Sequence, residues 1–525
     1  MSKTLRISLA VLAGLLVSAS FPIYLYGWRA PELGWLMWIA LVPLFVAIRD
    51  SSPRGTFFLT FLSSLIWYFT SLFWVVHAMY VYGDLSLGIS IFLLMLLVLM
   101  YSVYIALAPM LAVWIKNSWR GELIVWLPVL WVAIELCRNY FPFDGFSWSN
   151  ITMSQWRMIH LIQIVDLVGV YGLMFLIVWV NVFFADCICK IRGDVVRYFV
   201  PKAVVTVFVF ILTVSYGYWR ISNISLDIEK SERINVALIQ GNISQDDKWL
   251  PDKAQGILDK HRRQVVSLKN SPVDLIVWPE SALPIFIETT DKSVDPELLG
   301  IYEGNIDTPP LTFLGAISET PKLKYYNSAI LFDSRGRILE RYHKSHLTPF
   351  GEYIPYDWLL FFANKLTKPS GDFLFGESHR PLDAGRFKFG ALICYEDTFP
   401  EISRESVLMG AGLLVNVTNN AWFGETSAPL QQLALSVFRA VENRRYFVRA
   451  TNTGVSAVVA PTGQVLVESR LFEPALIVAN VGLLSMITPY TSLGDWFAWG
   501  CVAYSALGII IVIILYVKGR KKHEA

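Results

Sequence analysis

The sequence predicts a membrane protein of two parts: an all-α bundle of eight transmembrane helices, and one α/β domain inserted between the seventh and eighth helices. Three observations predict this fold class. Hydrophobic residues make up 54% of the chain and charged residues only 16%, whereas soluble domains carry about 25% charge. Long apolar runs recur over the first 220 residues and once more near the C-terminus. A polar region from Ser222 to about Ser485 separates them.

The predicted spans are apolar runs, most of them close to the length of about 20 residues at which a helix crosses a bilayer. They are Leu5–Tyr24, Leu33–Ile48, Phe57–Met79, Leu85–Val113, Leu123–Leu136, Val165–Ile188, Tyr198–Tyr216 and Trp496–Val517. The first run has a basic start, as a signal peptide does, but a bulky Phe-Pro-Ile-Tyr sequence follows it in place of a small-residue cleavage site. We therefore expect a retained helix there.

The distribution of Lys and Arg predicts the orientation of the bundle. Basic residues collect in loops on the cytoplasmic side of a membrane. With a cytoplasmic N-terminus, the short outside loops hold only Arg29, Arg138 and Arg157, and the basic C-terminal tail also falls inside. Both termini are therefore predicted to be cytoplasmic, and the polar domain is predicted to lie on the periplasmic face of a bacterial inner membrane.

The polar region has the pattern of an α/β domain. Short β-rich runs alternate with helix-like stretches such as Asp252–Leu268 and Pro429–Asn443, with turn residues at the joints. The β-rich runs are Ile234–Gln240, Leu275–Trp278, Leu311–Ala316, Ala329–Asp333, Phe387–Ile393, Leu413–Val417 and Val455–Ala460. The predicted division of the chain is 1–220 for seven transmembrane helices, 221–485 for the catalytic domain, and 486–525 for the last helix and a basic tail.

Charge and cysteine content exclude several kinds of function. The net charge of +2 and the lack of basic runs interleaved with aromatics argue against binding to nucleic acid. The five cysteines form no Cys-x-x-Cys pair and no Cys/His spacing typical of zinc, so no metal site is expected. Four of them lie in or beside apolar runs, which leaves Cys394 alone in the polar region. A free thiol exported to an oxidising compartment is a liability unless it has a function.

Three polar side chains follow predicted strands, and ligands of α/β domains tend to bind at strand ends. Glu280 follows the buried run Leu-Ile-Val-Trp-Pro, where partial burial would raise the pKa of a carboxylate and suit it to act as a base. Lys344 and Cys394 follow two later strands. Each has an ordinary alternative role: a helix cap or turn acid for Glu280, a surface charge for Lys344 and a buried structural thiol for Cys394.

Together, these segments resemble the nitrilase superfamily. The motifs are Trp-Pro-Glu at Glu280, Lys-x-x-Leu-x-Pro-Phe-Gly-Glu-Tyr-x-Pro from Lys344, and Ile-Cys-Tyr-Glu-Asp-x-Phe-Pro around Cys394, followed by Asn-Val-Thr-Asn-Asn-Ala-Trp-Phe-Gly over Asn416–Gly424. The resemblance implies an α-β-β-α sandwich with Cys394 as nucleophile, Glu280 as general base and Lys344 as stabiliser of the oxyanion. It also implies that Glu352 and Glu396 orient Lys344 and shape the pocket.

Seven predicted helices before this domain and one after it make the whole chain similar to the bacterial apolipoprotein N-acyltransferase family. That resemblance implies an acyl donor such as phosphatidylethanolamine, an S-diacylglyceryl apolipoprotein as acceptor, a ping-pong reaction through a cysteine thioester, and no cofactor. The aromatic residues expected to line the substrate cleft are Trp249, Tyr395 and Trp422. An apolar loop that would be poorly soluble if exposed is expected to form a lid against lipid. Its residues are Trp358, Leu359, Leu360, Phe361 and Phe362.

Two alternatives remain at this stage. A membrane-tethered nitrilase-type amidase could use the same three residues to hydrolyse a soluble carbon–nitrogen bond. A transporter or receptor with an extracytoplasmic binding domain would carry charged residues deep in several spans or paired breaks in its helices. Such features are few in this sequence: Glu135, Asp166 and His77 lie near predicted span ends or at uncertain depth. The sequence therefore disfavours the second alternative.

Overall fold

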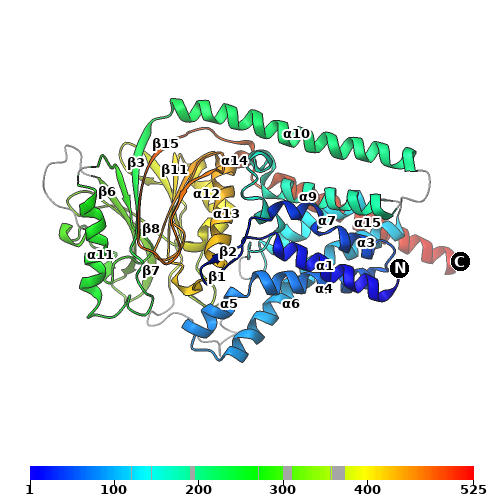
Figure 1. Ribbon diagram of the computed structural model, residues 1–525, viewed down its shortest axis with the longest axis horizontal. Helices are drawn as coiled ribbons and strands as arrows, with labels where there is room; N and C mark the ends of the chain where they lie inside the picture. Colours follow the sequence, from blue (N-terminus) through cyan, green and yellow to red (C-terminus); the bar gives the residue numbers. More distant parts are fainter. Residues whose placement is uncertain are drawn as a thin grey trace.

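The computed structural model describes residues 1–119, 121–142, 145–189, 195–269, 271–299, 310–354, 356 and 373–524. Figure 1 shows two parts side by side, a bundle of helices and a sandwich of β-strands, with the long helix α10 running along the outside of the bundle to the sandwich. Both chain termini lie at the end of the bundle that is far from the sandwich (Figure 1). An all-α part and an α/β part are thus both present, as the sequence predicts.

Each predicted span is largely helical in the structure. The helices of the bundle are α1 (Lys3–Ala19), η1 (Gly34–Leu36), α2 (Met37–Ala40), α3 (Val42–Ile48), α4 (Pro53–Ser71), α5 (Trp74–His77), η2 (Ala78–Tyr82), α6 (Leu87–Ser118), α7 (Leu123–Arg138), η3 (Ile151–Gln155), α8 (Ile159–Ile162), α9 (Val165–Cys189), α10 (Val195–Lys230) and α15 (Trp496–Glu524). A short hairpin of β1 (Tyr24–Leu25) and β2 (Trp28–Arg29) follows α1. The predicted spans therefore correspond to real helices, although several are broken.

Helix length alone supports fewer crossings than eight. Within the described residues, four helices are long and apolar enough to cross a membrane: α6, α9, the Phe199–Lys230 part of α10 and the Trp496–Leu515 part of α15. Helix α4 and the segment Trp74–Tyr82 would add a fifth if the pair, which is bent by 48°, forms one span. A chain with several apolar helices of this length is a membrane protein.

The sandwich contains two β-sheets. One has the strand order β15-β3-β4-β6-β7-β8, with β5 paired to β6, and the other has the order β14-β13-β12-β11-β10-β9. The first sheet consists of β3 (Arg233–Gln240), β4 (Leu275–Val277), β5 (Phe286–Glu288), β6 (Leu311–Glu319), β7 (Tyr325–Phe332), β8 (Ile338–His343) and β15 (Ala475–Gly482). The second consists of β9 (Leu382–Asp383), β10 (Lys388–Ile393), β11 (Leu413–Thr418), β12 (Tyr446–Thr451), β13 (Ala457–Val459) and β14 (Val465–Glu468).

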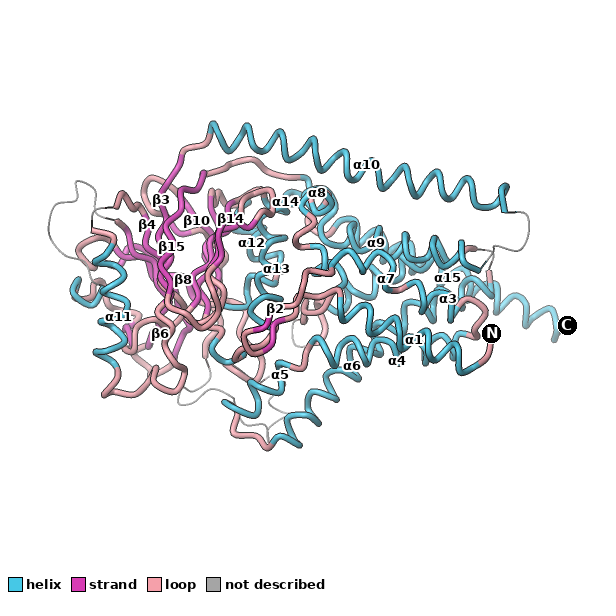
Figure 2. The backbone as a smooth tube through the Cα atoms, viewed as in Figure 1, coloured by secondary structure: helices cyan, strands magenta, loops and turns pink. Residues whose placement is uncertain are grey.

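Alternating side chains of each strand form two different cores, because successive residues of a strand point to opposite faces. On β3, Val236 and Leu238 face the second sheet, whereas Ala237 and Ile239 pack under helix α11 (Ala254–Ser267). Helices α12 (Pro400–Leu408) and α13 (Ala428–Asn443) cover the outer face of the second sheet. Figure 2 shows these layers in the order helix, sheet, sheet, helix. The predicted α-β-β-α sandwich is confirmed.

Helix α13 lies between the sandwich and the bundle and is buried along its whole length. Its apolar side chains belong to the same continuous core as those of the bundle helices. At the C-terminal end of α13, Arg444 forms an ion pair of 2.7 Å with Asp166 of α9, and both side chains are fully buried. The shared core and this ion pair fix the position of the sandwich, and of any site in it, relative to the membrane helices.

Candidate active site

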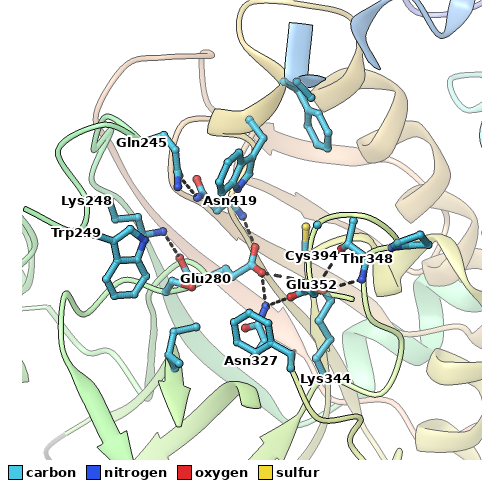
Figure 3. Close-up of a pocket in the computed structure, with 18 of the residues that line it drawn as sticks. Gln245, Lys248, Trp249, Glu280, Asn327, Lys344, Thr348, Glu352, Cys394 and Asn419 are labelled. Carbon is cyan, nitrogen blue, oxygen red and sulfur yellow. Dashed lines mark hydrogen bonds and ion pairs between the residues drawn. The ribbon is translucent and has the colours of Figure 1, made fainter. Parts of the chain in front are cut away.

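The three side chains that the sequence singles out come from different strand ends and line one cavity. Glu280 follows β4 and Lys344 follows β8 in the first sheet, while Cys394 follows β10 in the second. All three line a cavity of about 180 Å³ between the two sheets (Figure 3). A carboxylate, a cation and a thiol are thus brought together, although Glu280 and Cys394 are more than a hundred residues apart along the chain.

Cys394 is the first residue of the turn η5 (Cys394–Thr398), where its backbone has a φ angle of +55°. This left-handed conformation is uncommon for a residue with a side chain and is found where the surrounding structure enforces it, often at active sites. Burial, reinforced by the charge of Glu280 and opposed by that of Lys344, raises the pKa of the Cys394 thiol to about 12. The resting group is therefore a neutral thiol, and a base is needed to make it a nucleophile.

Glu280 is held by two neutral donors. The side-chain amide of Asn327 on β7 donates to one carboxylate oxygen at 2.8 Å, and the backbone N–H of Asn419 donates to the other at 2.8 Å. The ammonium of Lys344 lies 4.0 Å from the same carboxylate. Glu280 as a whole is 7% exposed, and these contacts fix the orientation of its carboxylate within the cavity.

Lys344 is almost completely buried and is paired with Glu352. Its ammonium donates to a Glu352 oxygen at 2.7 Å and to the Thr348 hydroxyl at 3.2 Å. Burial lowers the pKa of Lys344, but the charges of Glu352, Cys394 and Glu280 outweigh burial and raise it above the ordinary value. Burial raises the pKa of Glu352, and the Lys344 charge with hydrogen bonds from Asn327 and Thr348 outweighs this and lowers it. Lys344 is therefore a permanent cation beside the thiol.

Glu396 acts on the backbone around the site. It is fully buried and accepts hydrogen bonds from the backbone N–H groups of Ile393 at 2.7 Å, Ser345 at 2.7 Å and His346 at 3.1 Å. Its carboxylate thus ties the end of β10 to the segment that carries Lys344. Glu396 thus bonds to the main chain next to Lys344, whereas Glu352 contacts the Lys344 ammonium directly.

Two family models match this chain. The model described as "Carbon-nitrogen hydrolase" matches residues 235–488, which contain both sheets and the cavity. The model described as "Apolipoprotein N-acyltransferase N-terminal domain" matches residues 13–183, which begin within α1 and end within α9 of the bundle. The combination of a nitrilase-superfamily domain with this membrane domain narrows the assignment to membrane-bound members of the superfamily.

Relatives of known name match over nearly the whole chain. An apolipoprotein N-acyltransferase of Geobacter metallireducens is 38% identical over 512 residues, which cover 95% of this chain and 94% of the relative. An apolipoprotein N-acyltransferase of Methylococcus capsulatus is 31% identical over 510 residues, with 94% of each chain covered. The chain belongs to the apolipoprotein N-acyltransferase family. This membership identifies an N-acyltransferase and favours that reading over the amidase and the transporter alternatives.

A solved structure, that of Saccharomyces cerevisiae Nit3, a member of branch 10 of the nitrilase superfamily, is 22% identical to the N-acyltransferase chain. The match covers 48% of this chain and 90% of Nit3, with a TM-score of 0.37.

The aromatic residues predicted to line the cleft of the N-acyltransferase separate into two groups. Trp249 and Trp422 line the cavity, Trp249 stacked on Phe286 at 6.0 Å and Trp422 edge-on to Tyr82 of the bundle at 5.2 Å. Tyr395 is not among the described cavity-lining residues: its ring lies under the Lys344 ammonium at 5.7 Å, and its hydroxyl donates to the Leu347 carbonyl. Tyr395 therefore lies beside the Lys344 ammonium and is not one of the described cavity-lining residues.

The predicted lid, Trp358–Phe362, lies outside the described residues. Beyond the undescribed stretch that contains it, Phe373 lines the cavity and Phe375 is 47% exposed. Among the described residues, no group of three or more His, Cys, Asp or Glu side chains is arranged to hold a metal ion.

Several polar residues that line the cavity were not singled out from the sequence, among them Lys248, Asn327 and Asn419. Asn419 falls inside the Asn416–Gly424 segment that carries the family resemblance, so its presence near the site was implied without a role. Asn327 is the third residue of β7, between Tyr326 and Ser328, and a buried polar residue in a strand is a weak signal of a hydrogen-bonding position. Lys248 sits in a short polar loop that looks solvent-exposed in the sequence.

Proposed function

We propose that this N-acyltransferase moves a fatty acyl chain from a phospholipid, such as phosphatidylethanolamine, to the N-terminal α-amine of the S-diacylglyceryl cysteine of an apolipoprotein. In this proposal Cys394 carries the acyl chain as a thioester, Glu280 is the general base and Lys344 stabilises the oxyanion. The observation that carries the proposal is that a buried thiol, a hydrogen-bonded carboxylate and a permanent cation line one cavity in a chain of this family.

In the first half-reaction, the Cys394 sulfur attacks the ester carbonyl of the phospholipid while Glu280 takes the thiol proton. A base is required because the pKa of the thiol is about 12, so almost no thiolate exists at neutral pH. The Lys344 ammonium stabilises the negative charge that develops on the carbonyl oxygen. The carbon–oxygen bond of the ester then breaks, and the proton held by Glu280 passes to the departing lysophospholipid.

In the second half-reaction, the neutral α-amine of the apolipoprotein attacks the thioester carbonyl. Glu280 takes a proton from the amine nitrogen, Lys344 again faces the oxyanion, and the carbon–sulfur bond breaks. The proton returns from Glu280 to the sulfur, and the products are an amide and the original thiol. No net oxidation occurs, and each half-reaction exchanges one acyl bond for another.

The size of the cavity supports transfer from a membrane-bound donor. Pockets that enclose drug-sized ligands have about 300–1,000 Å³, whereas this cavity has about 180 Å³. Only part of a lipid, its reacting ester and the groups next to that ester, fits within it, and the acyl tails must lie outside, in contact with the bundle or the bilayer. A small buried cavity also limits the water that would hydrolyse the thioester. We propose that the Trp358–Phe362 segment, which lies outside the described residues, forms a lid against lipid.

The proposed location is the inner membrane of a bacterium, with eight spans, both termini cytoplasmic and the catalytic domain periplasmic. The proposed boundaries are 1–220, 221–485 and 486–525. The distribution of basic residues supports this orientation, and so does the position of both termini at the end of the bundle away from the sandwich (Figure 1). A reporter active only outside the cytoplasm should be active when fused near residue 300 and silent when fused after Ala525. Reversed activities would contradict the orientation.

The function is tested by mixing the purified protein in phospholipid vesicles with a synthetic S-diacylglyceryl lipopeptide. We expect the lipopeptide to gain one acyl chain through an amide bond, and we expect Cys394→Ser and Glu280→Gln to abolish this gain, because neither variant can form the thioester. A short soluble amide serves as the control substrate and should remain intact. Hydrolysis of the soluble amide without acylation of the lipopeptide would contradict the proposal and support the amidase alternative.

A further inference from the structure

A second buried lysine lines the cavity, and the mechanism above does not use it. Lys248 lies in the loop between β3 and α11, and its side chain is 4% exposed. Its ammonium donates one hydrogen bond of 3.0 Å, to the backbone carbonyl oxygen of Glu280. An ammonium has three N–H donors, so this contact satisfies only part of its capacity.

Lys248 differs from Lys344 in its counter-charge. Lys344 is paired with Glu352 at 2.7 Å. Among the described residues, no carboxylate oxygen lies within the 4.0 Å that defines an ion pair with Lys248. A buried charge without a partner is costly, and proteins retain one chiefly where a ligand or a reaction uses it. Burial lowers the pKa of Lys248 to about 8, against the opposing charges of Glu280 and Cys394. The group is still mostly protonated at pH 7.

Lys248 and Cys394 lie in different parts of the cavity. In Figure 3, Lys248 and Cys394 lie on opposite sides of Glu280. The neighbouring polar groups on the Lys248 side are neutral: the Gln245 amide oxygen accepts from the Asn419 amide at 2.8 Å. The cavity therefore has one cation, Lys344, in a close ion pair with Glu352 and another, Lys248, in no ion pair with any described residue.

We propose that Lys248 binds the phosphodiester of the donor phospholipid while the donor's ester carbonyl lies at Cys394. This inference rests on the proposed function. A phospholipid carries a phosphate a few bonds from its ester carbonyls, and a lysine ammonium is a common phosphate ligand in proteins. The S-diacylglyceryl cysteine of the acceptor carries no phosphate. Lys248 therefore acts in the first half-reaction and not in the second, and it helps the enzyme to take its acyl chain from a phospholipid.

The hydrogen bond to the Glu280 carbonyl allows a different role, in which Lys248 only holds Glu280 in place. The two roles have different kinetic consequences. Glu280 serves both half-reactions, so a loss of its position slows both. A loss of phosphate binding slows only acylation, and only when the donor carries a phosphate.

The test measures the two half-reactions separately on Lys248→Met and Lys248→Arg. The exposed Lys253 of the same loop provides the matched control, Lys253→Met. Thioester formation on Cys394 is followed by intact mass with phosphatidylethanolamine, and separately with a phosphate-free p-nitrophenyl ester of the same acyl chain. The preformed thioester is then chased with the S-diacylglyceryl lipopeptide.

We expect Lys248→Met to slow acylation by phosphatidylethanolamine roughly tenfold to a hundredfold, the effect of losing a hydrogen bond to a charged group. Acylation by the phosphate-free ester and the lipopeptide chase should keep the rates of the wild-type enzyme. Lys248→Arg, which keeps the charge, should recover most of the phospholipid rate, and Lys253→Met should behave as wild type. Equal slowing with both donors, or of both half-reactions, would assign Lys248 to the positioning of Glu280 and overturn the proposal.

Two further outcomes are distinguished in the same experiment. If the wild-type enzyme forms no thioester from phosphatidylethanolamine, the proposed function itself fails. If it does and Lys248→Met forms the thioester equally fast, only the Lys248 proposal fails. Inorganic phosphate is added to the phosphate-free reactions to separate a lipid phosphate from a free ion. Acceleration by inorganic phosphate that disappears in Lys248→Met would assign a free phosphate to the site and contradict the lipid assignment, whereas an unchanged rate agrees with it.

Discussion

The reactivity of Cys394 toward a small alkylating reagent should rise about tenfold for each pH unit between pH 6 and pH 10, without a plateau. Alkylation requires the thiolate, and burial together with the Glu280 charge raises the pKa of this thiol to about 12. The thiolate fraction at pH 7 is therefore roughly one in 100,000, compared with roughly 3% for an ordinary cysteine with a pKa near 8.5. On this fraction alone, Cys394 would react roughly three thousand times more slowly than an ordinary cysteine.

The greater basicity of the Cys394 thiolate offsets part of this difference, because the nucleophilicity of a thiolate increases with its pKa. With a Brønsted coefficient of about 0.4–0.5, the pKa difference of about 3.5 increases the rate constant of the thiolate by a factor of roughly 25 to 60. The net expectation at pH 7 is that Cys394 reacts on the order of a hundredfold more slowly than an unhindered thiol. The slope with pH does not depend on this correction.

The assay is iodoacetamide labelling in detergent, with glutathione in the same tube as the reference thiol. Peptide mass spectrometry separates Cys394 from the other four cysteines, and Cys394→Ala shows the background. A labelling rate that levels off near neutral pH would refute the reasoning. It would mean that Cys394 and Lys344 already form a thiolate–ammonium pair at rest, and that Glu280 has no proton to remove in the first step.

Three variants test the contacts around the site. Glu352→Gln removes the nearer counter-charge of the buried Lys344 ammonium and leaves only Glu280 at 4.0 Å, so the free energy of unfolding in detergent should fall by up to about 3–5 kcal/mol; a melting temperature equal to that of the wild type would contradict the role of this pair. Arg449→Met leaves the fully buried Asp397 carboxylate unpaired and should cost a similar amount, part of which Asp397→Asn in the same chain should restore. Lys344→Met should slow single-turnover acylation on the order of a hundredfold or more, and an unchanged rate would remove Lys344 from the mechanism.

Two of the three candidate catalytic residues, Glu280 and Cys394, could be placed from the sequence because each follows a strand whose apolar run is visible, whereas Lys344 follows β8, whose sequence Ile-Leu-Glu-Arg-Tyr-His has no such run. The runs before Glu280 and Cys394 match β4 and β10 within a residue or two. Strand β12, by contrast, has the sequence Tyr-Phe-Val-Arg-Ala-Thr and was not predicted. Its Arg449 is completely buried because Asp397, which follows Cys394 by three residues, supplies the opposite charge. A central strand with an internal arginine can be recognised only when its distant partner is known.

The break between helices α4 and α5 could also not be predicted from the sequence. The apolar stretch Phe57–Met79 predicts a single span, but the helix ends at Ser71 and restarts at Trp74 with a bend of 48°. Gln431 of α13 donates to the Ser71 carbonyl at 3.2 Å and accepts from the Trp74 indole at 3.1 Å, which stabilises the break. Gln431 lies 357 residues after Trp74 in the sequence, so the hydropathy of the span carries no information about these contacts. Lys248 could not be recognised from the sequence for the same reason, because its loop buries it only when the chain is folded.

The central claim, an acyl-enzyme on Cys394, is tested most directly by the intact mass of the protein after incubation with phosphatidylethanolamine of a single acyl composition and no acceptor. The account predicts a mass increase of one acyl group, located on the peptide that contains Cys394. The added mass should be removed by neutral hydroxylamine, which cleaves thioesters, and should be absent from Cys394→Ala. It should also disappear when the S-diacylglyceryl lipopeptide is added, with the acyl chain recovered on the peptide amine. Acylation of the lipopeptide by a protein that never carries the added mass, or by Cys394→Ala, would contradict the account.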